Sequence, residues 1–130
     1  MSAIQDRVAA GADRVAAAQS VLKAIVARES LEVMVGPMHH MVPLREGGAF
    51  LSLAFRRYPG TTVDDFREWW YSQHAPLCIP ILGEEMLGYD QVHVDPDMTR
   101  KAAEALGVPF VDYDAYDNLT YRSQEGFLIS

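Results

Sequence analysis

The sequence has one cysteine in 130 residues, Cys78, which excludes an internal disulfide framework and any zinc site built from cysteines. It also lacks an apolar run of the roughly 20 residues that a membrane-spanning helix needs. Charged residues interrupt the N-terminal stretch, where a signal peptide would be continuously apolar. These absences predict a soluble, cytoplasmic protein with no membrane partner.

Basic residues are also few. Eleven Lys and Arg stand against 18 Asp and Glu, and the net charge is −7. A chain this acidic is a poor ligand for a phosphate backbone, so we expect no nucleic-acid partner. The sequence has no GxGxxG, P-loop, GxSxG or HExxH pattern, and the neighbouring His39 and His40 are expected to point apart in an extended loop. We therefore expect no cofactor and no metal.

The remaining composition, 49% hydrophobic and 22% charged, is that of a globular domain. The charges of residues 1–36 cancel and Gly36-Pro37 follows, which predicts an N-terminal appendage over 1–36 and a core domain over 37–130. Small apolar residues recur in a heptad pattern over 3–29, which predicts a helix. Two alternatives stay open for this helix: it packs on its own domain, or it docks on a partner subunit.

Alternation and turn residues predict the strands, and Thr62 and Asp95 are the expected N-caps of two helices, the second of which ends at Gly107. Residues 37–48 are expected to form a loop, and residues 76–86 a separate short helix or an irregular lid. Helices are expected over 63–74 and 96–106, and strands over 31–35, 49–58, 88–94 and 115–122.

The helix over 63–74 carries the first candidate site residue. Its apolar stripe is formed by Val63, Phe66, Trp70 and Leu77, with Trp69 beside it. His74 follows Trp70 by four residues, so it is expected on the buried face, either as a core residue or in a pocket beneath the helix. Proline disfavours a helical residue before it, so Pro76 predicts a helix end close to His74.

The strand over 88–94 carries the second candidate. Tyr89, Gln91 and His93 share one face, which forms either a solvent face or the polar wall of a cavity. Cys78, in an apolar stretch between two prolines, is expected to be an inert buried thiol. Three aspartates near the last strand, Asp112, Asp114 and Asp117, predict a solvated acidic face.

Three runs of the sequence resemble the EthD-like family and follow one another in the order typical of that family: FRRYPGTTVDDFREWWYSQHAPL, GYDQVHV and YDAYDNLTYRS. The resemblance covers roughly residues 49–123. The matching residues are Arg57, Pro59, Gly60, Phe66, Trp70, His74, Ala75, Pro76, Leu77, Tyr89, Gln91, His93 and Asp114.

The resemblance implies an α+β fold. It predicts a ferredoxin-like subunit with an antiparallel sheet, which pairs with a second subunit in a dimeric α/β barrel and here carries an extra N-terminal helix. A homodimer or larger homo-oligomer is therefore expected. Characterised members of the family include decarboxylases, dehydratases and cyclases of aromatic or polyketide-like molecules, without metal or organic cofactor. Others have no assigned reaction.

The chain departs from the family pattern at its end, because only SQEGFLIS follows residue 122, where a second long helix and a fourth strand should stand. One explanation is a circular permutation, in which the N-terminal helix and the strand over 31–35 take those places. The other is that these residues are a fragment, and that the missing elements lie beyond Ser130 or in another chain. The sequence leaves both open.

Two functions follow from these residues. The first is a cofactor-independent lyase or isomerase that acts on a small apolar carbonyl or phenolic compound. His74 would be the general acid/base, His93 the second proton-transfer or orienting group, and the remaining side chains would bind the substrate: Tyr89, Gln91, Phe66, Trp69, Trp70 and Tyr71. The second is a non-catalytic subunit that binds a small molecule. A histidine with a free ring nitrogen in an enclosed pocket would favour the enzyme.

Overall fold

The computed structural model describes residues 10–11, 13–14, 17 and 30–125, and these residues form two units. One unit contains the described residues of 1–36 together with Val94–Asp112. The other contains Pro37–His93 and the described residues from Tyr113 onward. Most of the helix expected over 3–29 lies outside the described residues, of which 10, 11, 13, 14 and 17 are helical.

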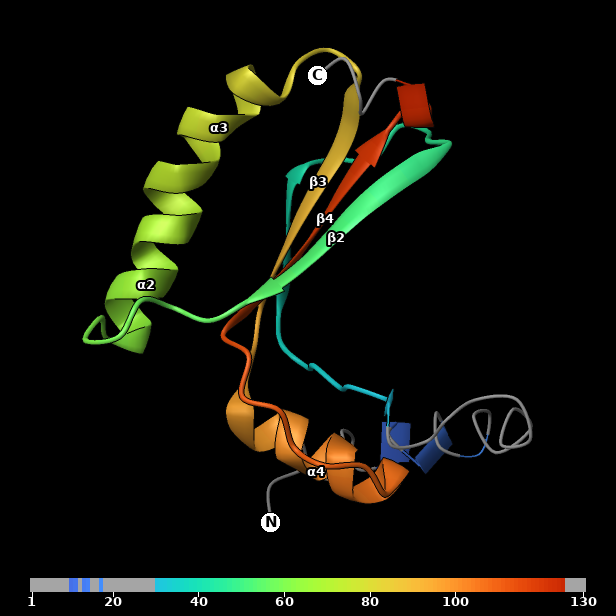
Figure 1. Cartoon of the computed structure of the whole chain (residues 1–130), viewed down its shortest axis with the longest axis vertical. Helices are drawn as coiled ribbons and strands as arrows, with labels where there is room; N and C mark the ends of the chain where they lie inside the picture. Colours follow the sequence, from blue (N-terminus) through green and yellow to red (C-terminus); the bar gives the residue numbers. More distant parts are fainter. Residues whose placement is uncertain (1–9, 12, 15–16, 18–29, 126–130) are drawn as a thin grey trace. The chain divides into compact units, whose positions relative to one another are not determined.

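The second unit is built on a four-stranded antiparallel sheet (Figure 1). Its strand order is β1-β3-β4-β2, and every neighbouring pair is antiparallel. β2 and β3 therefore run in the same direction on either side of β4, as in a ferredoxin-like fold. The strands are β1 (Met38–Val42), β2 (Ala49–Phe55), β3 (Met86–His93) and β4 (Ala115–Tyr121).

The strand register confirms the predicted face of β3. Leu53 pairs with Asp117, and Asp117 pairs in turn with Gln91, so these three side chains lie in one row on one face. Gln91 pairs with His39, which adds the edge strand to the same row. β4 alternates strictly between buried and half-exposed residues, whereas β3 is buried along almost its whole length.

One continuous helical run covers this face of the sheet (Figure 1). It comprises α2 (Val63–Trp69), η3 (Trp70–His74) and α3 (Ala75–Leu82). As predicted, Thr62 caps α2: its hydroxyl accepts the Asp65 N–H at 3.1 Å, and two aspartates stand in the first turn.

The prediction that this helix ends near His74 is wrong. η3 is a π-helical turn in which the Ala75 N–H bonds to the Trp70 carbonyl, five residues back. The wider turn relieves the crowding that the Pro76 ring would otherwise produce, and the chain continues as α3. The extra residue moves the buried stripe by one position, so Ala75 is buried where His74 was expected. Leu77, expected on the same stripe, is exposed.

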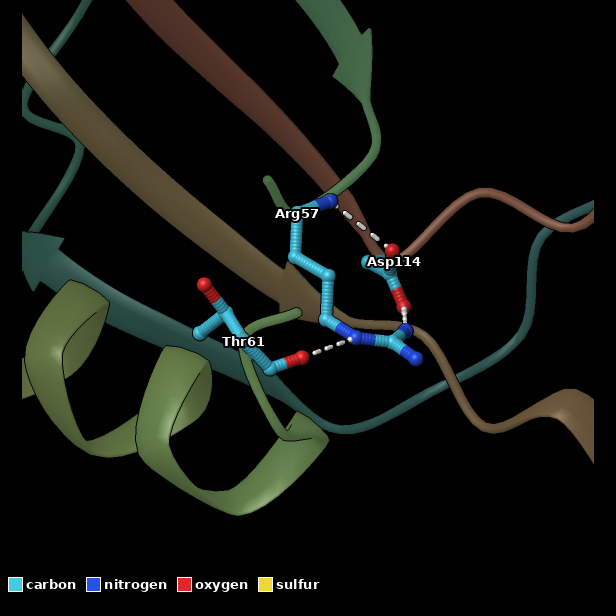
Figure 2. A network of polar contacts seen from close by, with 3 residues as sticks. All are labelled: Arg57, Thr61 and Asp114. Atoms are coloured by element: carbon cyan, nitrogen blue, oxygen red, sulfur yellow. Dashed lines mark hydrogen bonds and ion pairs between the residues drawn. The ribbon is translucent and has the colours of Figure 1, made fainter. Parts of the chain in front are cut away.

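Arg57 and Asp114 join the end of β2 to the start of β4 (Figure 2). The Asp114 carboxylate accepts the Arg57 backbone N–H at 2.9 Å and its Nη1 at 2.6 Å. Arg57 Nε donates to the Thr61 carbonyl at 2.7 Å, just before the α2 cap. Asp114 therefore fixes the turn that leads into the helix, and the prediction that it belongs to a solvated acidic face is wrong.

The first unit is built around α4 (Pro96–Leu106). As predicted, Asp95 caps it by accepting the Met98 N–H at 3.0 Å, and Gly107 ends it in the left-handed conformation at φ 69°. Buried Thr99 accepts the Val35 N–H and donates to the Val35 carbonyl. Among the described residues, the structure has no helix long and apolar enough to span a membrane.

Two sequence predictions for residues 31–48 are wrong. Residues 31–35 are not a strand, because the Val35 backbone bonds to Thr99 and Asp95 instead of to a neighbouring strand. Residues 37–48 are not all loop, because β1 lies between the two prolines that indicated one. In a circularly permuted ferredoxin-like fold, the strand that precedes β2 in the chain would pair with β2. β1 pairs with β3 instead, so it does not take that place.

Candidate functional site

Three polar side chains of β3 form a hydrogen-bonded chain beneath the helical run. Gln91 Nε2 donates to the Trp70 carbonyl at 2.9 Å and to the Tyr89 hydroxyl at 3.0 Å. Gln91 Oε1 lies 3.0 Å from His93 Nε2. Gln91 is fully buried, and both ends of its amide have partners. The face is therefore an interior wall, not the solvent face that the sequence left open.

The position of Gln91 fixes which ring nitrogen of His93 carries the hydrogen. A carbonyl only accepts, so the amide nitrogen must face Trp70 and the amide oxygen must face His93. His93 Nε2 then carries the hydrogen and donates it, and Nδ1 carries the lone pair in the neutral ring. No described residue donates a hydrogen bond to Nδ1, since the one side-chain hydrogen bond of His93 uses Nε2.

Burial is the main reason that the pKa of His93 is lowered to about 4. His93 is 5% exposed, and charge on His39 and Arg67 lowers the pKa further. The imidazole is therefore neutral at pH 7. A negative group bound near Arg67 would offset the contribution of Arg67, although not that of burial, and would raise the pKa of His93.

Aromatic rings surround His93. The Trp70 ring lies against it with a centroid distance of 4.8 Å, and the His39 ring meets it edge-on at 4.7 Å. The Tyr71 ring lies 5.1 Å from His39 and 6.4 Å from His93. Sequence analysis missed His39 as a site residue. The alternation Met38, His39, His40 would have placed it on this face if β1 had been predicted as a strand.

An open cleft of about 510 Å³ lies in front of these rings. His39 and Tyr71 line the cleft and also contact His93, so His93 stands directly behind its wall. The other lining residues come from the first turns of α2 and are all charged: Asp64, Asp65, Arg67 and Glu68. The cleft therefore has an aromatic inner end and a charged outer rim.

The structure does not bring His74 into this group of rings. Its imidazole packs on Trp69 at 5.0 Å, and Trp69 is half exposed. Trp69 and Trp70 are successive helical residues and point about 100° apart. Each predicted catalytic histidine thus contacts a different tryptophan, and no described ring contact joins the two.

The predicted apolar wall is divided in the same way. Phe66 and Trp70 are buried, stack on each other at 5.6 Å and pack on Ala115 together with Phe55. Tyr71 lies at the cleft, half exposed. Trp69 lies outside with His74.

Asp117 is a buried carboxyl that sequence analysis placed wrongly on a solvated face. It is 6% exposed, and its Oδ1 is buried without a hydrogen-bond partner among the described residues. Burial raises its pKa to about 6. The signal that could have found it is the alternation of β4, which puts Asp117 on the same face as Ala115, Leu119 and Tyr121.

Two further groups lie under the helices. Burial raises the pKa of Tyr89 to about 12, so its hydroxyl stays protonated at neutral pH. Burial also raises the pKa of the Cys78 thiol, which agrees with the prediction of an inert cysteine. In the part of the chain that the structure describes, no three His, Cys, Asp or Glu side chains gather into a group that could hold a metal ion.

Comparison with protein families matches residues 58–129 to the EthD domain. Comparisons with curated proteins and with solved structures gave no significant match. The matched segment contains α2, η3, α3, β3 and β4, and with them Tyr89, Gln91, His93 and Asp117. It spans more than half of the chain, and the chain belongs to the EthD domain family.

Proposed function

We propose that this protein is a proton-transferring enzyme of the lyase or isomerase type that acts on a small, largely apolar carbonyl or phenolic compound. One observation carries the proposal: Gln91 fixes which ring nitrogen of His93 carries the hydrogen, and the Nδ1 lone pair of the neutral ring has no hydrogen-bond donor among the described residues. A histidine that only supports the fold would gain stability from a second partner. This one keeps a basic nitrogen behind the wall of a cleft.

The chemistry is a proton transfer within one substrate. His93 Nδ1 takes a proton from a carbon next to a carbonyl, and the electron pair of the broken C–H bond becomes part of an enolate. The developing negative charge, together with a substrate that offsets Arg67, raises the pKa of His93 as the proton moves. The imidazolium then returns the proton to another atom. In a decarboxylation, His93 Nδ1 would take the proton of the carboxylic acid, the electron pair of the broken C–C bond would stay on the carbon as CO₂ leaves, and the imidazolium would return the proton to that carbon.

The proposal favours His93 over His74 as the proton-transfer group. His93 lies behind the aromatic end of the cleft, whereas His74 packs on half-exposed Trp69. Tyr89 and Gln91 are assigned to holding His93, and His39, Trp70 and Tyr71 to the wall around it.

Deuterium exchange tests the proposal without knowledge of the natural reaction. The probe is 4-hydroxyphenylacetone in D₂O at neutral pH, followed by the loss of its benzylic proton signal in NMR. We expect the protein to accelerate exchange over buffer and His93→Gln to reduce the acceleration by at least about 10²-fold, the usual contribution of a general base. His40→Gln, on the opposite face of the sheet beside Asp90, is the matched control and should behave as wild type.

Two results would contradict the proposal. Loss of exchange in His74→Gln but not in His93→Gln would assign the chemistry to His74. No acceleration by the wild-type protein would favour the second function, a non-catalytic small-molecule-binding subunit. One observation supports that alternative: the rings around His93 are closely packed, and Trp70 is only 1% exposed.

We also propose that the protein is a homodimer in which two sheets pack face to face. The helical run covers one face of the sheet, and the other face carries Phe50, which is 71% exposed. A second copy would bury this side chain, and burial of a phenylalanine contributes about 1.5–3 kcal/mol. Light scattering at micromolar concentration should give twice the 14.5 kDa chain mass; the mass of a single chain would disprove it.

A further inference from the structure

Two buried polar atoms beneath the helical run have no hydrogen-bond partner in the part of the chain that the structure describes. Among the described residues, the buried side-chain nitrogen and oxygen atoms without a hydrogen bond are Trp70 Nε1 and Asp117 Oδ1. One is a donor only. The other is an acceptor when the carboxylate is ionised. Buried polar groups are almost always paired, so an unpaired donor and an unpaired acceptor in one interior require an explanation.

The two residues occupy neighbouring positions. Trp70 packs on Ala115, which stands two residues before Asp117 on the same face of β4. The Trp70 carbonyl accepts a hydrogen bond from Gln91, which is the cross-strand partner of Asp117. Residues paired across antiparallel strands have Cβ atoms about 5 Å apart.

Among the residues that the structure describes, Asp117 has no charge partner to justify its burial. The titratable groups whose electrostatic interactions involve it are Tyr89 and Cys78, both neutral at pH 7. An unpaired carboxyl in an apolar interior lowers stability, and such groups gather at functional sites. The cross-strand partner of Asp117 on β2 is Leu53, and the Leu53 side chain is 45% exposed. One side chain therefore separates Asp117 from solvent on this side.

We propose that Trp70 Nε1 and Asp117 Oδ1 form a binding site for a hydroxyl group of the substrate, phenolic or enolic. A hydroxyl is the smallest group that uses one oxygen to accept from the indole N–H and to donate to the carboxylate. A buried water has the same chemistry, so the test separates the two sources. The inference deepens the proposed function, because it specifies a hydroxyl-bearing substrate for the site around His93.

Binding, measured by calorimetry, tests the inference independently of catalysis. The probes are 4-hydroxyphenylacetone and 4-methoxyphenylacetone, because the ether keeps the acceptor and loses the donor. The wild-type protein should bind the hydroxyl compound at least about tenfold more tightly, the effect of leaving a buried acceptor unpaired. Asp117→Leu should reduce this preference to less than about threefold, whereas Asn118→Ala, on the opposite face of β4, should retain it.

A second variant keeps the inference testable if Asp117→Leu does not fold. Trp70→Phe retains a ring against Phe66 and His93 but removes the N–H, and should weaken binding of 4-hydroxyphenylacetone about fivefold or more. Equal or undetectable binding of the two probes by the wild-type protein would overturn the inference and would mean that a water occupies the site. An unchanged preference for the hydroxyl compound in Asp117→Leu would also overturn it, and so would an unchanged affinity for this compound in Trp70→Phe. If exchange depends on His93 but the preference is absent, only the hydroxyl site fails.

Discussion

Replacing Trp70 by alanine is expected to lower the free energy of unfolding by about 3–5 kcal/mol. The Trp70 ring is 1% exposed and lies between Phe55, Phe66 and His93. Its removal would leave a cavity at the point where α2 and η3 contact the sheet, and the packed rings around it cannot collapse without moving the helix. Urea unfolding followed by far-UV circular dichroism gives this difference without depending on tryptophan fluorescence.

The adjacent tryptophan is a matched control. Trp69→Ala deletes the same side chain from the same helix, but Trp69 is 46% exposed and contacts His74 instead of the core. We expect it to lower the free energy of unfolding by less than about 1 kcal/mol. Equal losses in the two variants would mean that the helical run does not pack on the sheet through Trp70.

The sequence pattern predicted the parts of the site that depend on strand alternation. Alternation along 88–94 placed Tyr89, Gln91 and His93 on one face, and the register confirms this. It could not tell an interior wall from a solvent face, because that depends on which face the helices cover. The Thr62 and Asp95 caps were also predicted correctly, since a capping side chain bonds only to residues near it in sequence.

The errors arise where a local rule was overridden by its neighbours. The rule that proline ends a helix failed at Pro76, because a π turn absorbed the strain. The same turn invalidated the four-residue spacing from which the burial of His74 was predicted. β1 was missed because Pro37 and Pro43 flank it, although the five residues between them alternate. Asp117 was placed on a solvated face because its burial is decided by β2 and β3, which pair with β4 over long sequence separations.

The second large effect expected is in the dependence of stability on pH. The pKa of His93 falls from 6.5 to about 4 on folding. Above pH 6.5 the ring is neutral in both states. As the pH falls toward 4, the unfolded chain takes up a proton that the folded protein does not, so the free energy of unfolding decreases. A shift of this size corresponds to about 3 kcal/mol.

Asp117 acts in the opposite direction. Its pKa rises from 3.8 to about 6 on folding. Below pH 4 the carboxyl is protonated in both states. As the pH rises through 6, the unfolded chain releases its proton first, so the free energy of unfolding again decreases, by about 3 kcal/mol. Between pH 4 and 6 the contributions of His93 and Asp117 therefore nearly cancel in the wild-type protein.

Single substitutions should reveal the two contributions separately. Relative to wild type, Asp117→Asn should gain about 3 kcal/mol in the free energy of unfolding between pH 4 and 7, because only the dependence on His93 remains. His93→Gln should lose a similar amount over the same range. Each variant is compared with the wild type at the same pH, so that the contributions of the other carboxylates to the free energy of unfolding cancel. Asn118→Ala adds or removes no titrating group, so its difference from the wild type should be the same at every pH.

The measurement is urea unfolding of the four proteins at several pH values from 4 to 7. The variant differences for Asp117→Asn and His93→Gln should diverge in opposite directions as the pH rises. Differences that stay flat for both would mean that neither group is held in the protonation state that its burial imposes. A flat difference for Asp117→Asn alone would show that its carboxyl has a polar partner in solution, which would also remove the basis of the hydroxyl site, whereas the role of His93 would stand.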